Sequence, residues 1–116
     1  MSKLGYFVYK DLGHGCLVSK YCNEGLNAPL TECANKIEQD GKSPDDFLCG
    51  TYLCTWIEST VDHETVTGEL KIKRRKDSEK DDFLEGLYTF EWTHPNAKPF
   101  RGDAMLFEGL LIGAYI

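Results

Sequence analysis

Three histidines and five cysteines are the side chains of this sequence best suited to chemistry, and their spacing is irregular. His14, His63 and His94 all lie in predicted turns. Imidazole titrates near neutral pH, so His63 and His94 would form an acid–base pair if the fold brought them to Glu58 or Glu91. A small enzyme using such a pair stays open as one hypothesis. The simpler interpretation is three separate turn histidines.

The cysteines do not have the spacing of a metal site. The closest pairs have four and five residues between them, whereas structural zinc sites usually combine two close pairs of ligands. Cys16 lies beside a predicted turn two residues after His14, which makes it the best candidate for a reactive thiol. Otherwise we expect small buried hydrophobic side chains, and we predict no metal and no cofactor. The five are Cys16, Cys22, Cys33, Cys49 and Cys54.

Arg101-Gly102-Asp103 has the sequence of an adhesion tripeptide. Adhesion requires an exposed loop of an extracellular protein, whereas these residues fall inside a predicted strand. We therefore expect a structural use. Arg101 and Asp103 share a strand face and can pair with Glu91 or Lys98 on a neighbouring strand, which is worth roughly 0.2–1 kcal/mol.

Large aromatic side chains recur on one face of the predicted strands and give the best lead to a function. They can line a ligand cavity, or they can simply fill a core, because each aromatic side chain buries a large apolar area. If a cavity exists, we predict that Arg101 is the polar anchor at its mouth. The predicted lining consists of Tyr52, Trp56, Tyr88, Phe90 and Trp92.

The elements that position these residues are β-strands, because hydrophobicity alternates with period two along most of the chain. Residues 31–37 fit either a short strand or one helical turn, and residues 40–46 form a loop by composition. Residues 75–82 are predicted to be a charged loop tip, and Asp11 to Gly15 a turn. Glu108-Gly109 suits a two-residue hairpin, since glycine accepts positive φ. Strands are predicted at residues 6–9, 16–21, 50–59, 68–74, 86–94, 100–107 and 110–116.

About eight sequential strands in 116 residues predict a single all-β domain, residues 1–116, that closes into an antiparallel up-and-down barrel. Closure hides both sheet edges. It also explains the apolar C-terminal segment 110–116, which we interpret as the closing strand, flanked on both sides and partly covered outside. Small residues on the last two strands (Gly102, Ala104, Gly113, Ala114) either face the large aromatics or mark a close approach.

The pattern of strands, glycines and aromatics over residues 50–116 resembles the calycin-like barrels of the lipocalin and avidin type. The resemblance rests on Gly50-x-Tyr52-x-x-x-Trp56, Gly68 to Ile72, Tyr88 to Trp92, Gly102-Asp103-Ala104 and Leu111 to Tyr115. Gly5-Tyr6-Phe7 stands where lipocalins carry Gly-x-Trp. The resemblance implies a barrel that holds a small apolar ligand, and it transfers no specific site.

Charge and composition restrict the classes of partner that we expect for this protein. The net charge is −6, whereas nucleic-acid binding usually shows a basic surface, so we expect no nucleic-acid partner. No segment approaches the roughly 18 apolar residues that would span a membrane, so we expect no membrane partner. The N-terminus has no apolar segment typical of a secretory signal, which predicts a cytoplasmic protein.

The leading hypothesis is a non-enzymatic barrel that binds a small apolar or aromatic ligand. The alternative is a homodimeric interaction module with a filled barrel, because Leu53, Ile57, Met105 and Phe107 place apolar groups on the outer face.

Overall fold

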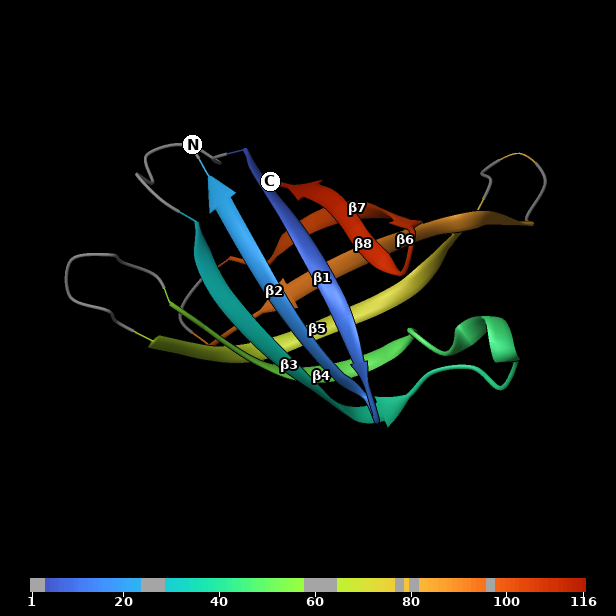
Figure 1. Cartoon of the computed structure of the whole chain (residues 1–116), viewed down its shortest axis with the longest axis horizontal. Coiled ribbons are helices and arrows are strands. Elements are labelled where there is room, and N and C mark those ends of the chain that lie inside the picture. The colour runs from blue at the N-terminus through green and yellow to red at the C-terminus, as the bar shows by residue number, and fades with distance from the viewer. Residues whose placement is uncertain (1–3, 24–28, 58–64, 77–78, 80–81, 96–97) are drawn as a thin grey trace.

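A computed structural model of the chain shows eight antiparallel strands that close into a barrel in sequence order (Figure 1). It describes residues 4–23, 29–57, 65–76, 79, 82–95 and 98–116. The strands are β1 (Gly5–Gly13), β2 (Cys16–Asn23), β3 (Leu30–Gln39), β4 (Gly50–Ile57), β5 (Thr65–Lys76), β6 (Phe83–Thr93), β7 (Phe100–Phe107) and β8 (Leu110–Tyr115), with one 3₁₀ turn, η1 (Pro44–Asp46). The predicted fold class and strand count are confirmed.

The last strand closes the barrel, as the apolar C-terminal segment predicts. β8 pairs with β7 on one side and with β1 on the other, where Gly5 lies opposite Tyr115 and Lys10 opposite Leu110. On its outer side, Ile112 is 40% exposed and Leu110 is half-buried. Its apolar character therefore reflects pairing on both edges and burial on the inner face.

The glycines of the last two strands mark a close approach of backbones. A Cβ on Gly113 would collide with the carbonyl of Asp103, and a Cβ on Gly102 would collide with the carbonyl of Ala114. β7 and β8 can approach this closely only because these residues lack side chains. Of the two interpretations of the small residues, close approach therefore holds for these two glycines.

One of the two tight hairpins is tighter than the sequence indicates, and the other is as predicted. The β1–β2 turn contains only His14 and Gly15, both with positive φ (55° and 75°), rather than the whole segment from Asp11. Glu108 and Gly109 form the predicted two-residue turn, again with two positive φ angles. Positive φ at both positions matches the twist of a β-hairpin, which explains why so short a turn suffices.

Two segments needed the structure to be assigned. Residues 31–37 belong to a strand, β3, which spans Leu30–Gln39 and resolves the choice between strand and helical turn. The predicted charged loop at 75–82 is shorter, because β5 continues through Lys76. Residues 77–78 and 80–81 lie outside the described residues. Pairing with β6 carries β5 through this charged sequence, where Arg74 lies opposite Tyr88 and Lys76 opposite Phe83.

Candidate functional site

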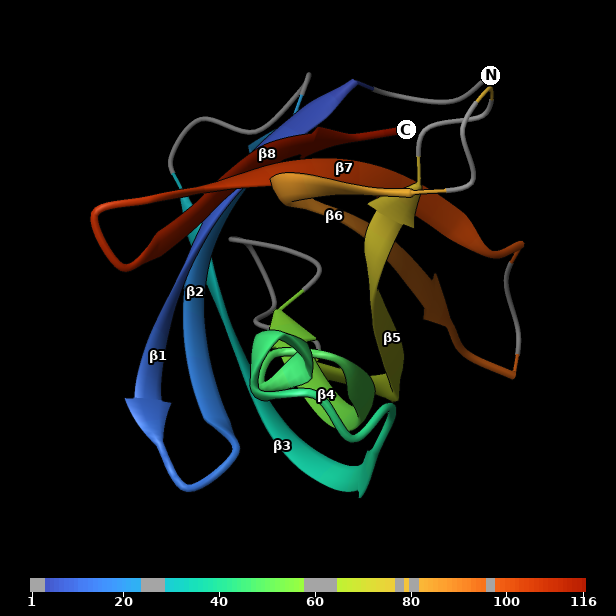
Figure 2. The ribbon, with the colours of Figure 1, turned by 90° about the vertical axis from the view of Figure 1, so that its right-hand side faces the viewer.

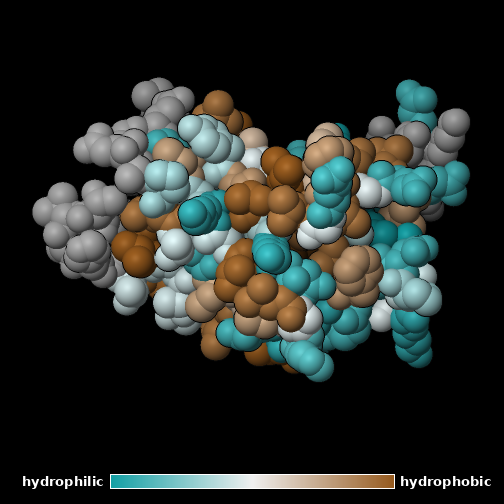
Figure 3. Space-filling model, viewed as in Figure 1, coloured by the Kyte–Doolittle hydropathy of each residue, from teal (hydrophilic) through white to brown (hydrophobic). Residues whose placement is uncertain are grey.

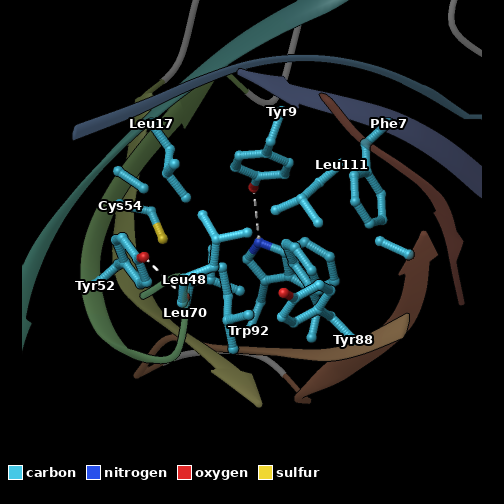
Figure 4. Close-up of a cluster of buried hydrophobic side chains, with 14 of the residues drawn as sticks. Phe7, Tyr9, Leu17, Leu48, Tyr52, Cys54, Leu70, Tyr88, Trp92 and Leu111 are labelled. Atoms are coloured by element: carbon cyan, nitrogen blue, oxygen red, sulfur yellow. Dashed lines mark hydrogen bonds between the residues drawn. The ribbon is translucent and has the colours of Figure 1, made fainter. Parts of the chain in front are cut away.

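The predicted aromatic side chains all point into the barrel (Figure 4). Each is 1–5% exposed. Phe7 and Tyr9 of β1 complete the cluster, and sequence analysis missed both; their spacing of two residues was the available signal. The rings pack directly: the Phe7 and Phe90 centroids lie 5.0 Å apart, and those of Phe90 and Trp92 lie 5.5 Å apart. The inward-facing set from the prediction is Tyr52, Trp56, Tyr88, Phe90 and Trp92.

The middle of the barrel is packed rather than open. Leu17, Leu70, Ile72 and Leu111 fill the space between the rings, each at most 2% exposed. The indole N–H of Trp92 donates a hydrogen bond of 3.3 Å to the phenol oxygen of Tyr9, and this bond crosses the interior (Figure 4). These residues therefore act as a core, and any ligand must bind towards an end of the barrel.

One end, here called the closed end, is covered by the segment that joins β3 to β4 (Figure 2). Leu48 from this segment is 2% exposed and belongs to the core. The phenol of Tyr52 donates a hydrogen bond of 2.9 Å to the Leu48 carbonyl. Burial raises the pKa of Tyr52, so the phenol stays protonated and keeps donating.

Charged groups hold this covering segment in place. Asp46 of η1 accepts a 2.7 Å bond from Nε of Arg74, and both side chains are largely buried. The guanidinium of Arg74 also lies 3.8 Å from the ring centroid of Phe83. Nζ of Lys36 donates a 2.6 Å bond to the carbonyl of Phe47. Strands β3 and β5 thus both hold the segment through direct contacts.

The opposite end, here called the aromatic end, is lined by rings that are only partly buried. Phe100 stacks on Trp92 with centroids 5.0 Å apart and an 11° interplanar angle. Phe100 also meets Tyr115 at 5.6 Å and Trp56 at 6.0 Å. Tyr21 completes the group at 6.5 Å from Tyr115. Of the five, Tyr21, Phe100 and Tyr115 keep part of their surface exposed. Residues 24–28, 58–64 and 96–97 lie outside the described residues.

Phenol groups tie the strands together at the aromatic end. The hydroxyl of Tyr21 donates to the carbonyl of Ile57, which connects β2 to β4. The amide of Asn23 donates a 3.1 Å bond to the hydroxyl of Tyr115, which connects β2 to β8. Both bonds use the polar tips of rings whose apolar bodies pack against the core, as amphipathic aromatics commonly do.

Glu32 is the unexpected residue of this end. It is 7% exposed and faces inward on β3, next to Trp56 in the register of β4. Burial raises its pKa from 4.5 to about 8, although hydrogen bonding from the Cys54 thiol and the Trp92 indole pulls the pKa the other way. Sequence analysis missed it. The available signal was its place in the alternating series Leu30, Glu32, Ala34, which puts a carboxyl on the inner face.

Arg101 does not join the aromatic residues. Its side chain is 79% exposed on the outside of β7, where Nε lies 3.0 Å from the Glu91 carboxylate. This is one of the cross-strand pairings that the sequence suggested. Asp103 lies 3.8 Å from Arg75 rather than pairing with Lys98. The tripeptide with Gly102 is therefore part of a strand, and Arg101 is not positioned to anchor a ligand inside the barrel.

Those histidines and cysteines that the structure describes do not assemble a recognisable centre. His14 lies in the first turn, His63 and Glu58 lie outside the described residues, and the ring of His94 packs on Trp56 at 5.6 Å. All five cysteines are free. Burial raises the pKa of the Cys54 thiol, which opposes nucleophilic use. Among the described residues, no group of three or more His, Cys, Asp or Glu side chains is arranged to hold a metal.

The outer surface carries two shallow grooves. One, of about 760 Å³, crosses β5 to β8 and is lined by charged groups that include Lys71, Lys73 and Glu91. The other, of about 690 Å³, has apolar residues such as Val8, Val18 and Leu110 in its lining. Figure 3 shows hydrophobic side chains among polar ones on the face where β1 and β2 lie.

Comparisons with known proteins leave the site to be interpreted from its own chemistry. No family model, no curated protein and no solved structure matches this chain. Within the described part of the chain, no helix has the length and apolar character needed to cross a membrane.

Proposed function

We propose that this protein is a non-enzymatic barrel that binds a small apolar or aromatic molecule at its aromatic end. The observation that carries the proposal is the placement of Glu32, a nearly fully buried carboxyl, beside Trp56, a buried ring of the aromatic end that packs against the partly exposed Phe100. Binding sites for small molecules typically combine an apolar, aromatic lining with a few fixed polar groups. The five rings and Glu32 supply both parts.

Packing limits where the ligand can lie. The middle of the barrel is filled and the closed end is covered by Leu48, so the ligand is expected over the exposed faces of Phe100, Tyr115 and Tyr21. This differs from a ligand held deep inside the barrel. In this arrangement Tyr52, Tyr88 and Phe90 belong to the core beneath the site. Trp56 and Trp92 pack directly against Phe100, one of the rings expected to contact the ligand. Kinship with the calycin-like barrels is part of the same proposal.

A second candidate is a homodimeric interaction module whose filled barrel is only a scaffold. The observation that favours it is a set of apolar side chains on the outer face of β7 and β8, where Met105 is 53%, Phe107 57% and Ile112 40% exposed. Met105 and Ile112 lie opposite each other in the register, so they form a continuous area. Exposed apolar areas of this kind often mark protein contacts.

A cytoplasmic location is part of the proposal. Its support is the free state of all five cysteines, three of which are half-exposed or exposed. Thiols of this kind persist in a reducing compartment, whereas secreted domains of this size usually pair them.

Two alanine variants on the same strand separate the candidates. Phe100→Ala removes a ring of the aromatic end, and Phe107→Ala removes an exposed ring from the outer face. Ligands are first sought by native mass spectrometry of freshly purified protein, then by NMR titration with small aromatic molecules. We expect shifts at Tyr21, Phe100 and Tyr115. We expect Phe100→Ala to weaken binding about tenfold, since ring contacts contribute roughly 0.5–1.5 kcal/mol beyond burial, and Phe107→Ala to leave it unchanged.

The opposite pattern would favour the interaction module. In that case the mass spectrum shows a dimer without added mass, and Phe107→Ala converts it to a monomer while Phe100→Ala does not. A monomer that binds none of the aromatic molecules would contradict both candidates.

A further inference from the structure

Glu32 is a carboxyl in surroundings that disfavour its charge. Its inward-facing neighbours in the β2 and β4 registers are Ser19 and Trp56. The thiol of Cys54 and the indole of Trp92, whose N–H also donates to Tyr9, lie close to this carboxyl. Burying a carboxyl without a counter-ion is unfavourable. None of the ion pairs among the described residues includes Glu32.

The other titratable groups near Glu32 are a thiol, two phenols and an imidazole that packs on Trp56. β4 contributes the thiol of Cys54, whose pKa is raised by burial. β1 contributes the phenol of Tyr9, which contacts Trp92, and β2 contributes the phenol of Tyr21, which donates to the Ile57 carbonyl. His94, which follows β6, packs on Trp56, the residue opposite Glu32 in the register. The site thus combines several aromatic rings with a carboxyl group that becomes negatively charged when it loses its proton.

We propose that the aromatic end selects molecules that carry a basic amine on a small apolar or aromatic body, with the ammonium group on the Glu32 carboxylate. This inference rests on the proposed ligand-binding function. Aromatic faces attract cations, and a desolvated carboxylate is the strongest partner for an ammonium group among neighbouring side chains. A neutral molecule of the same shape would leave the carboxyl without that partner.

Binding of an amine must then release a proton. At pH 7 the carboxyl is mostly protonated, because burial raises its pKa to about 8. The free amine arrives as an ammonium ion, and the complex pairs this ammonium with the carboxylate, so one proton leaves for the solvent. Affinity for the amine therefore rises about tenfold for each pH unit up to about pH 8 and then levels off.

The test uses two probes of nearly equal shape, 2-phenylethylamine and 2-phenylethanol. Binding is followed by tryptophan fluorescence, because the chain's two tryptophans, Trp56 and Trp92, both lie at the aromatic end. Titrations are made at pH 6, 7 and 8. We expect the amine to bind at least tenfold more tightly than the alcohol at pH 8, and its affinity to fall about tenfold per unit below that pH. The alcohol should show no such dependence.

Two variants of β3 serve as the matched pair. Glu32→Gln keeps the shape and removes the charge, and it should abolish both the preference for the amine and its pH dependence. Glu38→Gln removes an exposed carboxylate from the same strand and should change neither. Unfolding curves show whether both variants fold. Equal, pH-independent binding of the two probes would overturn the amine inference and keep the ligand site, whereas saturable binding of neither probe would count against the proposed function itself.

Discussion

The two ends of this barrel differ in how their buried polar groups are paired. At the closed end, every notable polar group has a partner of fitting charge: Arg74 meets Asp46, Lys36 meets the Phe47 carbonyl, and Tyr52 meets the Leu48 carbonyl. At the aromatic end, a carboxyl is buried among rings and hydrogen-bond donors without a cation. The closed end thus pairs its polar groups in the way that stabilises a fold, whereas the aromatic end leaves a buried carboxyl without a counter-ion.

This difference separates structural from functional parts of the molecule. Natural sequences are locally consistent with their folds, and departures are expected where binding or chemistry requires them. The closed end contains a capping arrangement, in which Ser43 accepts from the Asp45 amide and donates its own amide to Asp46. Such a segment positions Leu48 over the core. Nothing comparable explains Glu32, which is why we place the function there.

The largest effect should come from opening the closed end. Leu48→Ala removes a fully buried side chain and is expected to reduce the free energy of unfolding by about 2–5 kcal/mol. Phe47→Ala changes the preceding residue, which is 51% exposed, and should alter it by about 0.5 kcal/mol or less. Urea unfolding measures both. Similar losses in the two variants would mean that the segment does not cover the core as described.

The next effect concerns the aromatic end and appears as a dependence of stability on pH. The pKa of Glu32 is about 8 in the folded protein against 4.5 as its ordinary value. The folded state therefore holds a proton that the unfolded state has lost between these two values, and stability falls as pH rises through this window. The fall is about 1.4 kcal/mol per unit, on the order of 3 kcal/mol between pH 5 and 7.

Comparison of variants isolates this dependence from other titrating groups. The free energy of unfolding is measured for the unaltered protein, Glu32→Gln and Glu38→Gln from pH 4 to pH 9. We expect Glu32→Gln to lose the downward slope between pH 5 and 8, and Glu38→Gln to keep it. Parallel curves for all three proteins would show that Glu32 is not buried with a raised pKa.

Strand identity and the order of the barrel could be predicted from sequence because both depend on period-two alternation. That rule places five aromatic residues on the inner face, and all five lie there in the structure: Tyr52, Trp56, Tyr88, Phe90 and Trp92. Phe7 and Tyr9 follow the same rule but sit in a short predicted strand. The length of β5 could not be predicted, since its last residue, Lys76, is held by pairing with Phe83 after a shift in the register, rather than by local hydrophobicity.

The candidate site was harder to predict than the fold. Alternation says that a residue faces inward, but not how far along the barrel axis it lies or which ring opposes it. Glu32 was missed because a glutamate in a polar segment is normally solvated. The alternation of Leu30, Glu32 and Ala34 allowed an inward position, and the pairing of Glu32 with Trp56 and Ser19 establishes it. Whether a set of inward aromatics is a core or a cavity depends on packing across the barrel, which local sequence does not specify.

The smallest effect is expected at Arg101, the predicted anchor that lies on the outer face. Its ion pair with Glu91 is exposed, and exposed pairs contribute about 0–1 kcal/mol. Arg101→Gln should therefore change the free energy of unfolding by roughly 0.5 kcal/mol or less. It should also leave the affinity for 2-phenylethylamine unchanged, while Glu32→Gln removes the preference for the amine. An affinity loss at Arg101 equal to that at Glu32 would place the polar contact outside the barrel, at the groove between β5 and β8, and would reverse the contrast between the two ends.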